Sequence, residues 1–182
     1  MRPITNLMEG LSEHEREELG DLSIRCFGPP ELRTPHPLVI APDSDTRYVV
    51  RVWRAGLLVS CLWITERTIL IDEHPTRIAG IRGVRTDPAH RRQGFGAAGM
   101  RAAEEFVWRE LRPDLAMLLS SEMAVPFYQS LGWQVAAGPT YYDQPTGREC
   151  LNETLPERPT MVLLPDGGSM SPGPIDLCGL PF

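Results

Sequence analysis

The segment Arg91-Arg92-Gln93-Gly94-Phe95-Gly96 contains the residues best suited to binding an anion. It lies between a stretch with strand character and one with helical periodicity, where the first N–H groups of a helix lack partners and point outward. Glycine at positions 94 and 96 lets the backbone approach a pyrophosphate closely, and the dipole of the following helix favours negative charge there. Arg91 and Arg92 supply charge-assisted donors as well. The segment therefore predicts a phosphate-binding turn.

The elements on either side of this turn predict a strand, helix, strand unit. Residues Arg77 to Thr86 have strand character, and Asp87-Pro88 ends that strand. Apolar residues then recur at helical spacing from Ala97 to Trp108, and a short apolar strand follows from Leu115 to Leu119. This order is typical of a crossover connection between two strands of one sheet.

A helix and antiparallel strands are predicted before this unit. Ser12 and Glu15 have the spacing of a capping box, which predicts a helix over Glu13 to Phe27 that Gly28-Pro29-Pro30 ends. A loop rich in Pro and Asp is expected to reach Asp45. Strands that form an antiparallel meander are then expected over Arg47–Arg54, Leu57–Thr65, Arg67–Ile71 and Arg77–Thr86.

The last third of the chain predicts a short helix, two strands and a docked tail. The helix is expected from Ala124 to Leu131, since Gly132 follows it. Trp133 to Ala137 and Thr160 to Leu164 are expected to pair as closing strands around a polar loop. The tail is rich in Gly and Pro, yet its apolar surface predicts that it packs on the domain. That surface comes from Ile175, Leu177, Cys178, Leu180 and Phe182.

Composition excludes several classes of site. All 18 basic residues are arginine, so no lysine is present for a P-loop or a pyridoxal Schiff base. The net charge of −6 predicts attraction of a cationic substrate and no nucleic-acid partner. The four cysteines form no C-x-x-C pair and the four histidines lack ligand spacing, so we expect reduced thiols and no metal site. The longest apolar run is far below the roughly 20 residues of a membrane span, and no secretory signal precedes it, so we expect a cytoplasmic protein without a membrane partner.

Two segments together resemble the GNAT superfamily of N-acetyltransferases. Val84-Arg85-Thr86-Asp87-Pro88 followed by RRQGFG is similar to the acetyl-CoA signature of that family, and Pro126 to Trp133 is similar to its second signature. Two signatures in family order are more specific than either alone. The resemblance implies a single GNAT-like α/β (α+β) domain over residues 1–182, with a splayed mixed sheet, flanking helices and a core at about 47–165.

The resemblance also implies a site and a reaction. The pantetheine arm of acetyl-CoA, the co-substrate, would lie in the gap between the fourth and fifth strands. An amine would attack the thioester directly in a ternary complex, and Tyr128 matches the residue whose hydroxyl protonates the departing thiolate. The implied acetyl-CoA-binding residues are Val84, Arg85, Thr86, Arg91, Arg92, Gln93, Gly94, Phe95, Gly96 and Ala97.

Within the superfamily, the chain from about Val59 to Leu164 is most similar to the aminoglycoside 2′-N-acetyltransferases, which confer antibiotic resistance. Gly83-Val84 and Leu119-Ser120-Ser121 are among the shared segments. The similarity implies that Ser120 and Ser121 bind the acceptor, and that the tail at 166–182 folds over it.

Two departures from those enzymes concern the acceptor. Arg82 stands where they have an acidic residue, and the tail lacks their Asp-Trp and ends sooner, at Phe182. The aromatic end with its carboxylate is kept, and we expect that carboxylate to face Ser120 and Ser121, where it would hold a protonated amine. The acceptor therefore stays open between an aminoglycoside 2′-amine and another small amine or a peptide N-terminus.

Three further questions stay open in the sequence. A non-catalytic CoA-binding module remains the alternative to an enzyme, although an intact Tyr128 and phosphate turn disfavour it. A homodimer is compatible with the resemblance, because dimers are frequent in that family. The general base is either water or one of the carboxylates of Glu66, Glu122, Asp143, Glu149, Glu153 and Phe182.

Overall fold

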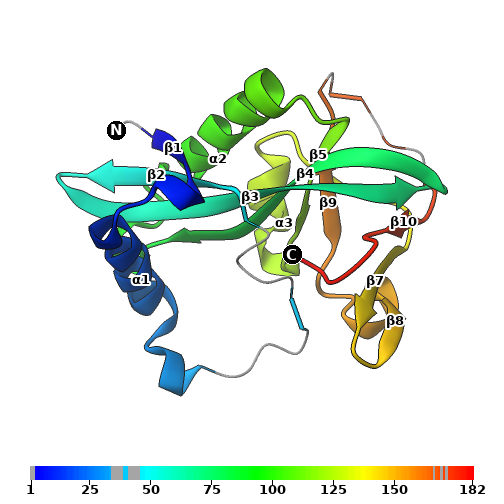
Figure 1. Cartoon of the computed structure of the whole chain (residues 1–182), viewed down its shortest axis with the longest axis horizontal. Helices are drawn as coiled ribbons and strands as arrows, with labels where there is room; N and C mark the ends of the chain where they lie inside the picture. Colours follow the sequence, from blue (N-terminus) through cyan, green and yellow to red (C-terminus); the bar gives the residue numbers. More distant parts are fainter. Residues whose placement is uncertain (1–2, 34–38, 41–45, 166, 169, 171) are drawn as a thin grey trace.

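A curved mixed sheet with a helix on each face forms the framework of the molecule (Figure 1). The computed structural model describes residues 3–33, 39–40, 46–165, 167–168, 170 and 172–182. The strand order is β6-β9-β5-β4-β3-β10-β7-β8, and β2 and β1 extend from the other part of β3. Among the described helices, none is long and apolar enough to cross a membrane.

The elements alternate along the chain as follows. The strands are β1 Pro3–Leu7, β2 Tyr48–Arg54, β3 Leu57–Ile71, β4 His74–Thr86, β5 Leu115–Leu119, β6 Gln134–Val135, β7 Thr140–Gln144, β8 Gly147–Cys150, β9 Thr160–Leu163 and β10 Ile175–Asp176. The α-helices are α1 Glu13–Phe27, α2 Phe95–Phe106, α3 Val125–Gln129 and α4 Leu151–Thr154, and a π-helical turn, Val107–Leu111, extends α2. Short 3₁₀ turns occupy Met8–Gly10, Pro30–Leu32, Pro88–His90 and Glu122–Ala124.

The capping box predicted for α1 is confirmed. The Ser12 hydroxyl accepts a hydrogen bond from the Glu15 N–H at 3.3 Å, and the Glu15 carboxylate accepts one from the Ser12 N–H at 2.8 Å. These bonds, together with one from Arg51, lower the pKa of Glu15 to about 2. Arg51 lies in β2 with only 2% of its surface exposed, and it forms an ion pair with Glu15. The Glu15 carboxylate therefore caps the N-terminus of α1 and also connects this helix to the sheet through a buried guanidinium group.

The predicted meander is present, but with fewer breaks than expected. The prediction of a separate strand at Arg67–Ile71 was wrong, because β3 runs unbroken to Ile71 and pairs with β4 from Ile64↔Ile81 to Ile71↔His74. In the sequence, the charged residue Glu66 follows the apolar run and suggests that the strand ends there. In the structure, its backbone pairs with Ala79 in the middle of this ladder. The strand β1, which pairs with β2, was not predicted.

The strand, helix, strand unit predicted around the glycine-rich turn is formed by β4, α2 and β5. The two strands pair in parallel, from Ile78↔Leu115 to Ile81↔Leu118. Beyond that pair, β4 continues to Thr86 without a ladder to β5. The sheet therefore splays at this point, which is the mixed splayed sheet that was expected.

A β-bulge lies in β4 beside the splay. Leu62 of β3 is opposed by two residues, Gly83 and Val84, because the register shifts between Trp63↔Arg82 and Cys61↔Arg85. Gly83 has a φ of +59°, and a Cβ atom there would lie 2.7 Å from the Trp63 ring. Only glycine fits this position without displacing the ring.

The core has one part on each face of the sheet. Met100, Ala103 and Val107 of α2 and its extension pack on one face, with Tyr128 and Trp133. The other face is covered by α1 over β2 and β3, and by the C-terminal segment over β4 and β5. Figure 1 shows α1 and α2 on opposite sides of the sheet.

The polar loop predicted between the closing strands contains structure of its own. Strands β6 and β9 pair as predicted, although β6 is only two residues long. Between them, β7 and β8 form a hairpin that α4 follows. The Tyr142 hydroxyl in β7 donates a hydrogen bond to Glu149 at 2.9 Å, so polar residues of the segment pair with one another across the hairpin.

The C-terminal tail docks through a short strand, as its apolar residues predicted. Strand β10 lies between β3, with which it is antiparallel, and β7, with which it is parallel. Ile175 and Leu177 are fully buried. Residues 166, 169 and 171 of the tail, and 34–38 and 41–45 of the expected loop before β2, lie outside the described residues.

Replacement of Gly138 by alanine should test how tightly the tail is held. A Cβ atom at position 138 would lie 2.0 Å from the carbonyl oxygen of Gly173, so the tail backbone would have to move. We expect Gly138→Ala to lower the free energy of unfolding by about 1–3 kcal/mol in urea denaturation. Gly168→Ala is the matched control, because a Cβ there meets nothing within 4 Å. Equal stability of the two variants would contradict this packing.

Candidate functional site

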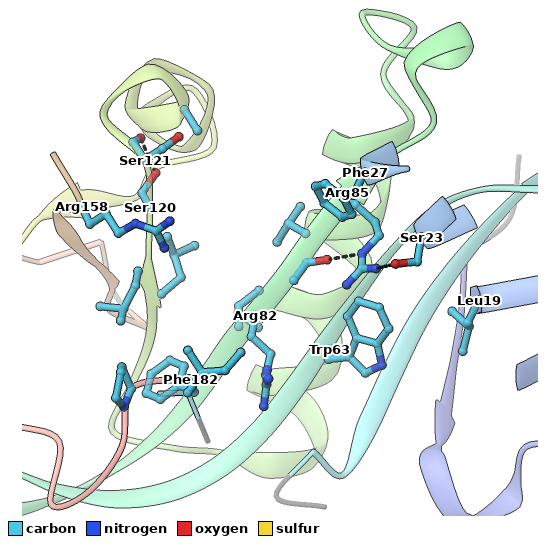
Figure 2. Close-up of a pocket in the computed structure, with 18 of the residues that line it drawn as sticks. Leu19, Ser23, Phe27, Trp63, Arg82, Arg85, Ser120, Ser121, Arg158 and Phe182 are labelled. Atoms are coloured by element: carbon cyan, nitrogen blue, oxygen red, sulfur yellow. Dashed lines mark hydrogen bonds between the residues drawn. The ribbon is translucent and has the colours of Figure 1, made fainter. Parts of the chain in front are cut away.

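A cavity of about 1270 Å³ opens on the α1 face of the sheet, where β4 and β5 separate. Figure 2 shows two walls: Arg85, Trp63, Ser23 and Leu19 lie on one side, and Ser120, Ser121 and Arg158 lie on the other. Further lining residues come from the β4 segment 81–85 and the end of the tail.

Tyr128 lies at the gap itself. It packs in the core cluster under α2 and also lines the cavity on the opposite face. Its ring contacts Phe127 and Trp133, with centroids 5.0 and 6.3 Å away. Burial raises the pKa of Tyr128 to about 12, so its hydroxyl stays protonated at any physiological pH. Such a hydroxyl can donate a hydrogen bond or a proton into the cavity.

A buried carboxyl group supports the position of Tyr128. The Trp133 indole N–H donates a hydrogen bond to Glu104 of α2 at 2.9 Å, and Arg101 contacts the same carboxylate at 3.2 Å. Burial raises the pKa of Glu104, and these two bonds partly offset the effect. Glu104 was not singled out in the sequence, where it reads as one acidic residue of an exposed helix face.

The glycine-rich segment forms the start of α2, next to the end of β4. Gly94 is the N-cap residue, with a φ of +83° in the left-handed region, and no side chain caps the helix. In the described part of the chain, the N–H groups of Phe95, Gly96 and Ala97 have no backbone acceptor. A Cβ atom on Gly96 would lie 3.1 Å from the Thr86 hydroxyl oxygen, so the backbone here already lies close to β4. This geometry suits an anion.

The polar side chains of this turn partly stabilise the turn itself. Arg91 donates to the Thr86 carbonyl at 3.2 Å, and Gln93 donates to the Ala89 carbonyl at 3.2 Å. Arg92 is exposed, with a φ of +59°. The Phe95 ring is buried beside β2 and β3, so only the backbone of this residue is available at the start of α2.

Asp87 fixes the turn to the rest of the molecule. Its carboxylate accepts hydrogen bonds from the Arg25 guanidinium of α1 at 2.6 Å and from the Ala89 N–H at 2.9 Å. Burial by itself would raise the pKa of Asp87, but these bonds outweigh it and hold the pKa below the usual range. In the sequence, Asp87 marks only the end of a strand, and no local pattern connects it to Arg25, which is 62 residues away.

The four residues expected to bind the acceptor all line this one cavity: Arg82, Ser120, Ser121 and Phe182. The Ser120 hydroxyl donates to the Ser121 carbonyl at 2.8 Å. The Phe182 ring packs over Gly80 of β4, where a Cβ atom would lie 2.8 Å from it, and beside the Arg67 guanidinium. Of the six carboxylates considered as a base, only that of Phe182 belongs to a lining residue.

The charged side chains that line the described part of the cavity are all arginines. They come from α1, from the turn after it, from β4 and from the segment before β9, and they are Arg16, Arg33, Arg82, Arg85 and Arg158. The net charge of −6 predicted attraction of cations, whereas this cavity is locally cationic. Net charge could not show this, because it averages over the whole surface.

Comparisons with known proteins agree with this arrangement. The family described as acetyltransferase (GNAT) domain matches residues 9–136. The comparison with curated proteins gives no match.

Several solved structures share the fold. ElaA of Escherichia coli has 18% identity and a TM-score of 0.62, over 88% of this chain and 97% of that one. An acyl-CoA N-acyltransferase from Pseudomonas aeruginosa has 19% identity and a TM-score of 0.59, with the same coverage of 88% and 97%. A GNAT family acetyltransferase from Brucella melitensis, solved with acetyl-CoA, has 13% identity and a TM-score of 0.56, over 96% and 94%.

Replacement of Gly94 by valine should separate phosphate binding from folding. A β-branched residue at a φ of +83° is strained, and its side chain would stand where the anion approaches. We expect the affinity for acetyl-CoA, measured by calorimetric titration, to fall by more than about tenfold. Gly147→Val in the β7–β8 turn is the control, because that glycine also has a positive φ and open space around it. The assignment fails if both variants bind acetyl-CoA as tightly as the wild type.

Proposed function

The chain belongs to the GNAT family of acetyltransferases, and from that premise we propose that it acetylates a small amine by direct transfer within a ternary complex. As a GNAT enzyme it uses acetyl-CoA as co-substrate. The observation that carries the proposal is the position of Tyr128, which lies between the helix α2 side of the sheet and the cavity on the α1 face.

Acetyl-CoA is proposed to bind along the gap between β4 and β5. The free N–H groups at the start of α2 would hold its pyrophosphate, with Arg91, Arg92, Gln93 and the backbone of 94–97 around it. The backbone of Val84, Arg85 and Thr86, which has no ladder to β5, would bond the pantetheine and acetyl groups. The bulge supports this assignment, because it turns backbone groups of β4 away from regular pairing.

The reaction then needs one attack and two proton movements. The amine nitrogen attacks the thioester carbonyl carbon, the carbon–sulfur bond breaks, and the electron pair leaves on sulfur. The Tyr128 hydroxyl hydrogen-bonds to this sulfur and protonates it, and the proton that the nitrogen loses as the amide forms restores the hydroxyl. Its raised pKa ensures that the proton is present before the attack.

The amine must lose its proton before it attacks, and the charge of the cavity assists this loss. Nearby positive charges disfavour an ammonium group and lower its pKa. No Asp, Glu or His side chain is among the described residues that line the cavity. We therefore propose that the proton passes to water or to the carboxylate of Phe182, which also lines the cavity.

The acceptor is proposed to be a small amine other than an aminoglycoside. An aminoglycoside carries several ammonium groups, which favour paired carboxylates. Here Arg82 and four other arginines line the cavity instead. Aminoglycosides, with their 2′-amine, are included among the acceptors of the experiment below.

Location and assembly stay predictions. The four cysteines are free, which supports the proposed cytoplasmic location, where thiols are kept reduced. The homodimer remains an expectation from the family resemblance.

Replacement of Tyr128 by phenylalanine tests the proposed acid. The ring packing is kept and only the hydroxyl is lost, so kcat should fall by roughly 10- to 1000-fold with little change in acetyl-CoA affinity. CoA thiol release is measured with aminoglycosides, polyamines, amino acids and peptides as acceptors. Tyr141→Phe, in β7 and away from the cavity, should retain the wild-type rate. An unchanged rate in Tyr128→Phe would show that this tyrosine is only part of the core.

Deletion of Leu180 to Phe182 tests whether the tail binds the acceptor. Because Pro181 and Phe182 line the cavity and no residue from Arg91 to Ala97 does, the KM for the acceptor should rise by about an order of magnitude while that for acetyl-CoA stays constant. Phe182→Leu is the control for folding, because it keeps an apolar side chain over Gly80 and the full length of the tail. If both constants change together, the tail has a structural role and does not bind the acceptor.

A further inference from the structure

We infer that the acceptor amine also carries an anionic group, a carboxylate or a phosphate, which the arginines of the cavity bind. The inference rests on the proposed function, because it takes the cavity on the α1 face as the acceptor site. It names the substrate class that this site fits.

The cationic lining is assembled from distant parts of the chain. Arg16 comes from α1, Arg33 follows the turn at Pro30–Leu32, and Arg158 precedes β9. The bulge at Gly83 places Arg82 and Arg85 on the same face of β4, because they pair with Trp63 and Cys61, two residues apart on β3. Like charges repel when they gather, so a cluster in a chain of net charge −6 indicates an anionic ligand.

Arg85 is held in a geometry suited to recognising an anion. Its guanidinium lies 4.3 Å from the Trp63 ring centroid and 5.1 Å from that of Phe27. It donates to the Ser23 hydroxyl at 2.8 Å and to the Gly83 carbonyl at 3.2 Å, as Figure 2 shows. A planar group fixed in this way is preorganised for a carboxylate or phosphate, which guanidinium groups bind through parallel hydrogen bonds.

Arg16 and Arg33 are anchored by neutral groups. Arg16 donates to the carbonyl oxygens of Met8 and Leu11 at 2.9 and 3.3 Å, and Arg33 donates to that of Gly28 at 2.9 Å. Carbonyl oxygens orient these side chains without cancelling their charge. Among the described residues, five arginines that lie outside the cavity pair with carboxylates: Arg25, Arg51, Arg101, Arg109 and Arg148.

The phosphates of acetyl-CoA do not account for this cluster. Their proposed site is the start of α2, and no residue from Arg91 to Ala97 lines the cavity. Arg16 and Arg33 belong to the α1 side, which covers the opposite face of the sheet from α2. The acceptor can therefore place its amine near Tyr128 and its anionic group among the arginines.

The experiment uses acceptors that differ only in the anionic group. Ethanolamine is compared with O-phosphoethanolamine, and β-alaninamide with β-alanine, so that the arms distinguish phosphate from carboxylate. We expect kcat/KM to be at least about tenfold higher for an anionic member, through a lower KM, and the ratio to shrink in high salt because screening weakens the attraction. An aminoglycoside, as a polycation, should be a poor acceptor.

Two variants and a control connect this preference to the cavity. Arg82→Glu and Arg33→Gln should each reduce the preference by about tenfold or more, with the KM for acetyl-CoA unchanged. Arg109→Gln alters an exposed arginine of the α2 extension and should leave the preference intact. A preference retained in both cavity variants would overturn the inference.

The remaining outcomes separate the inference from the proposed function. Efficient acetylation of neutral or polycationic amines, with anionic ones rejected, overturns the inference and leaves the acetyltransferase proposal standing. If acetyl-CoA binds but no amine in any arm is acetylated, the proposed function fails, and the inference fails with it.

Discussion

Because Gly83 has a positive φ and no side chain to collide with Trp63, β4 can carry one more residue than β3 beside the splay. This constraint determines the geometry of the site. Val84 is turned toward the α2 face, while Arg82 and Arg85 both point to the α1 face. Pairing with β5 ends just before the bulge, so the gap, the arginines and the free backbone of β4 occur together. Any side chain at position 83 would disturb all three.

In the proposed function, two anionic groups would bind at different places on the molecule. The start of α2 offers uncapped N–H groups, and Asp87 with Arg25 holds that turn against α1. The cavity on the other face offers guanidinium groups instead. Tyr128, uncharged because burial raises its pKa, lies between the two regions. In the proposed complex, positive potential on both sides of the reacting carbonyl would stabilise an oxyanion and disfavour an ammonium group.

Contiguous motifs could be predicted from the sequence, whereas features assembled from distant residues could not. The glycine-rich turn, the helix that carries Tyr128 and the helix α1 each depend on a few neighbouring residues, and the fold was confirmed. Phosphate binding at the turn and the acid role of Tyr128 stay predictions. Glu66 suggested that a strand ends there, but pairing with β4 continues through this residue. The β7–β8 hairpin could not be predicted, because its segment is rich in polar residues and was expected to be a loop. The arginine cluster forms only when the register of β4, the position of α1 and the position of the segment before β9 bring these side chains to one cavity. No periodicity in the sequence encodes that combination.

The short strand β10 has a consequence for the order in which the protein can be made. It is the link through which the β7–β8 hairpin joins the sheet, since β7 pairs only with β8 and β10 among the described strands. A ribosome delivers β10 after every other strand, and domains form from the N-terminus as they emerge. The wall of the cavity near the tail therefore stays incomplete until β10 has emerged. A chain truncated before β10 would lose both the pairing that joins the hairpin to the sheet and the part of the cavity wall that Pro181 and Phe182 form.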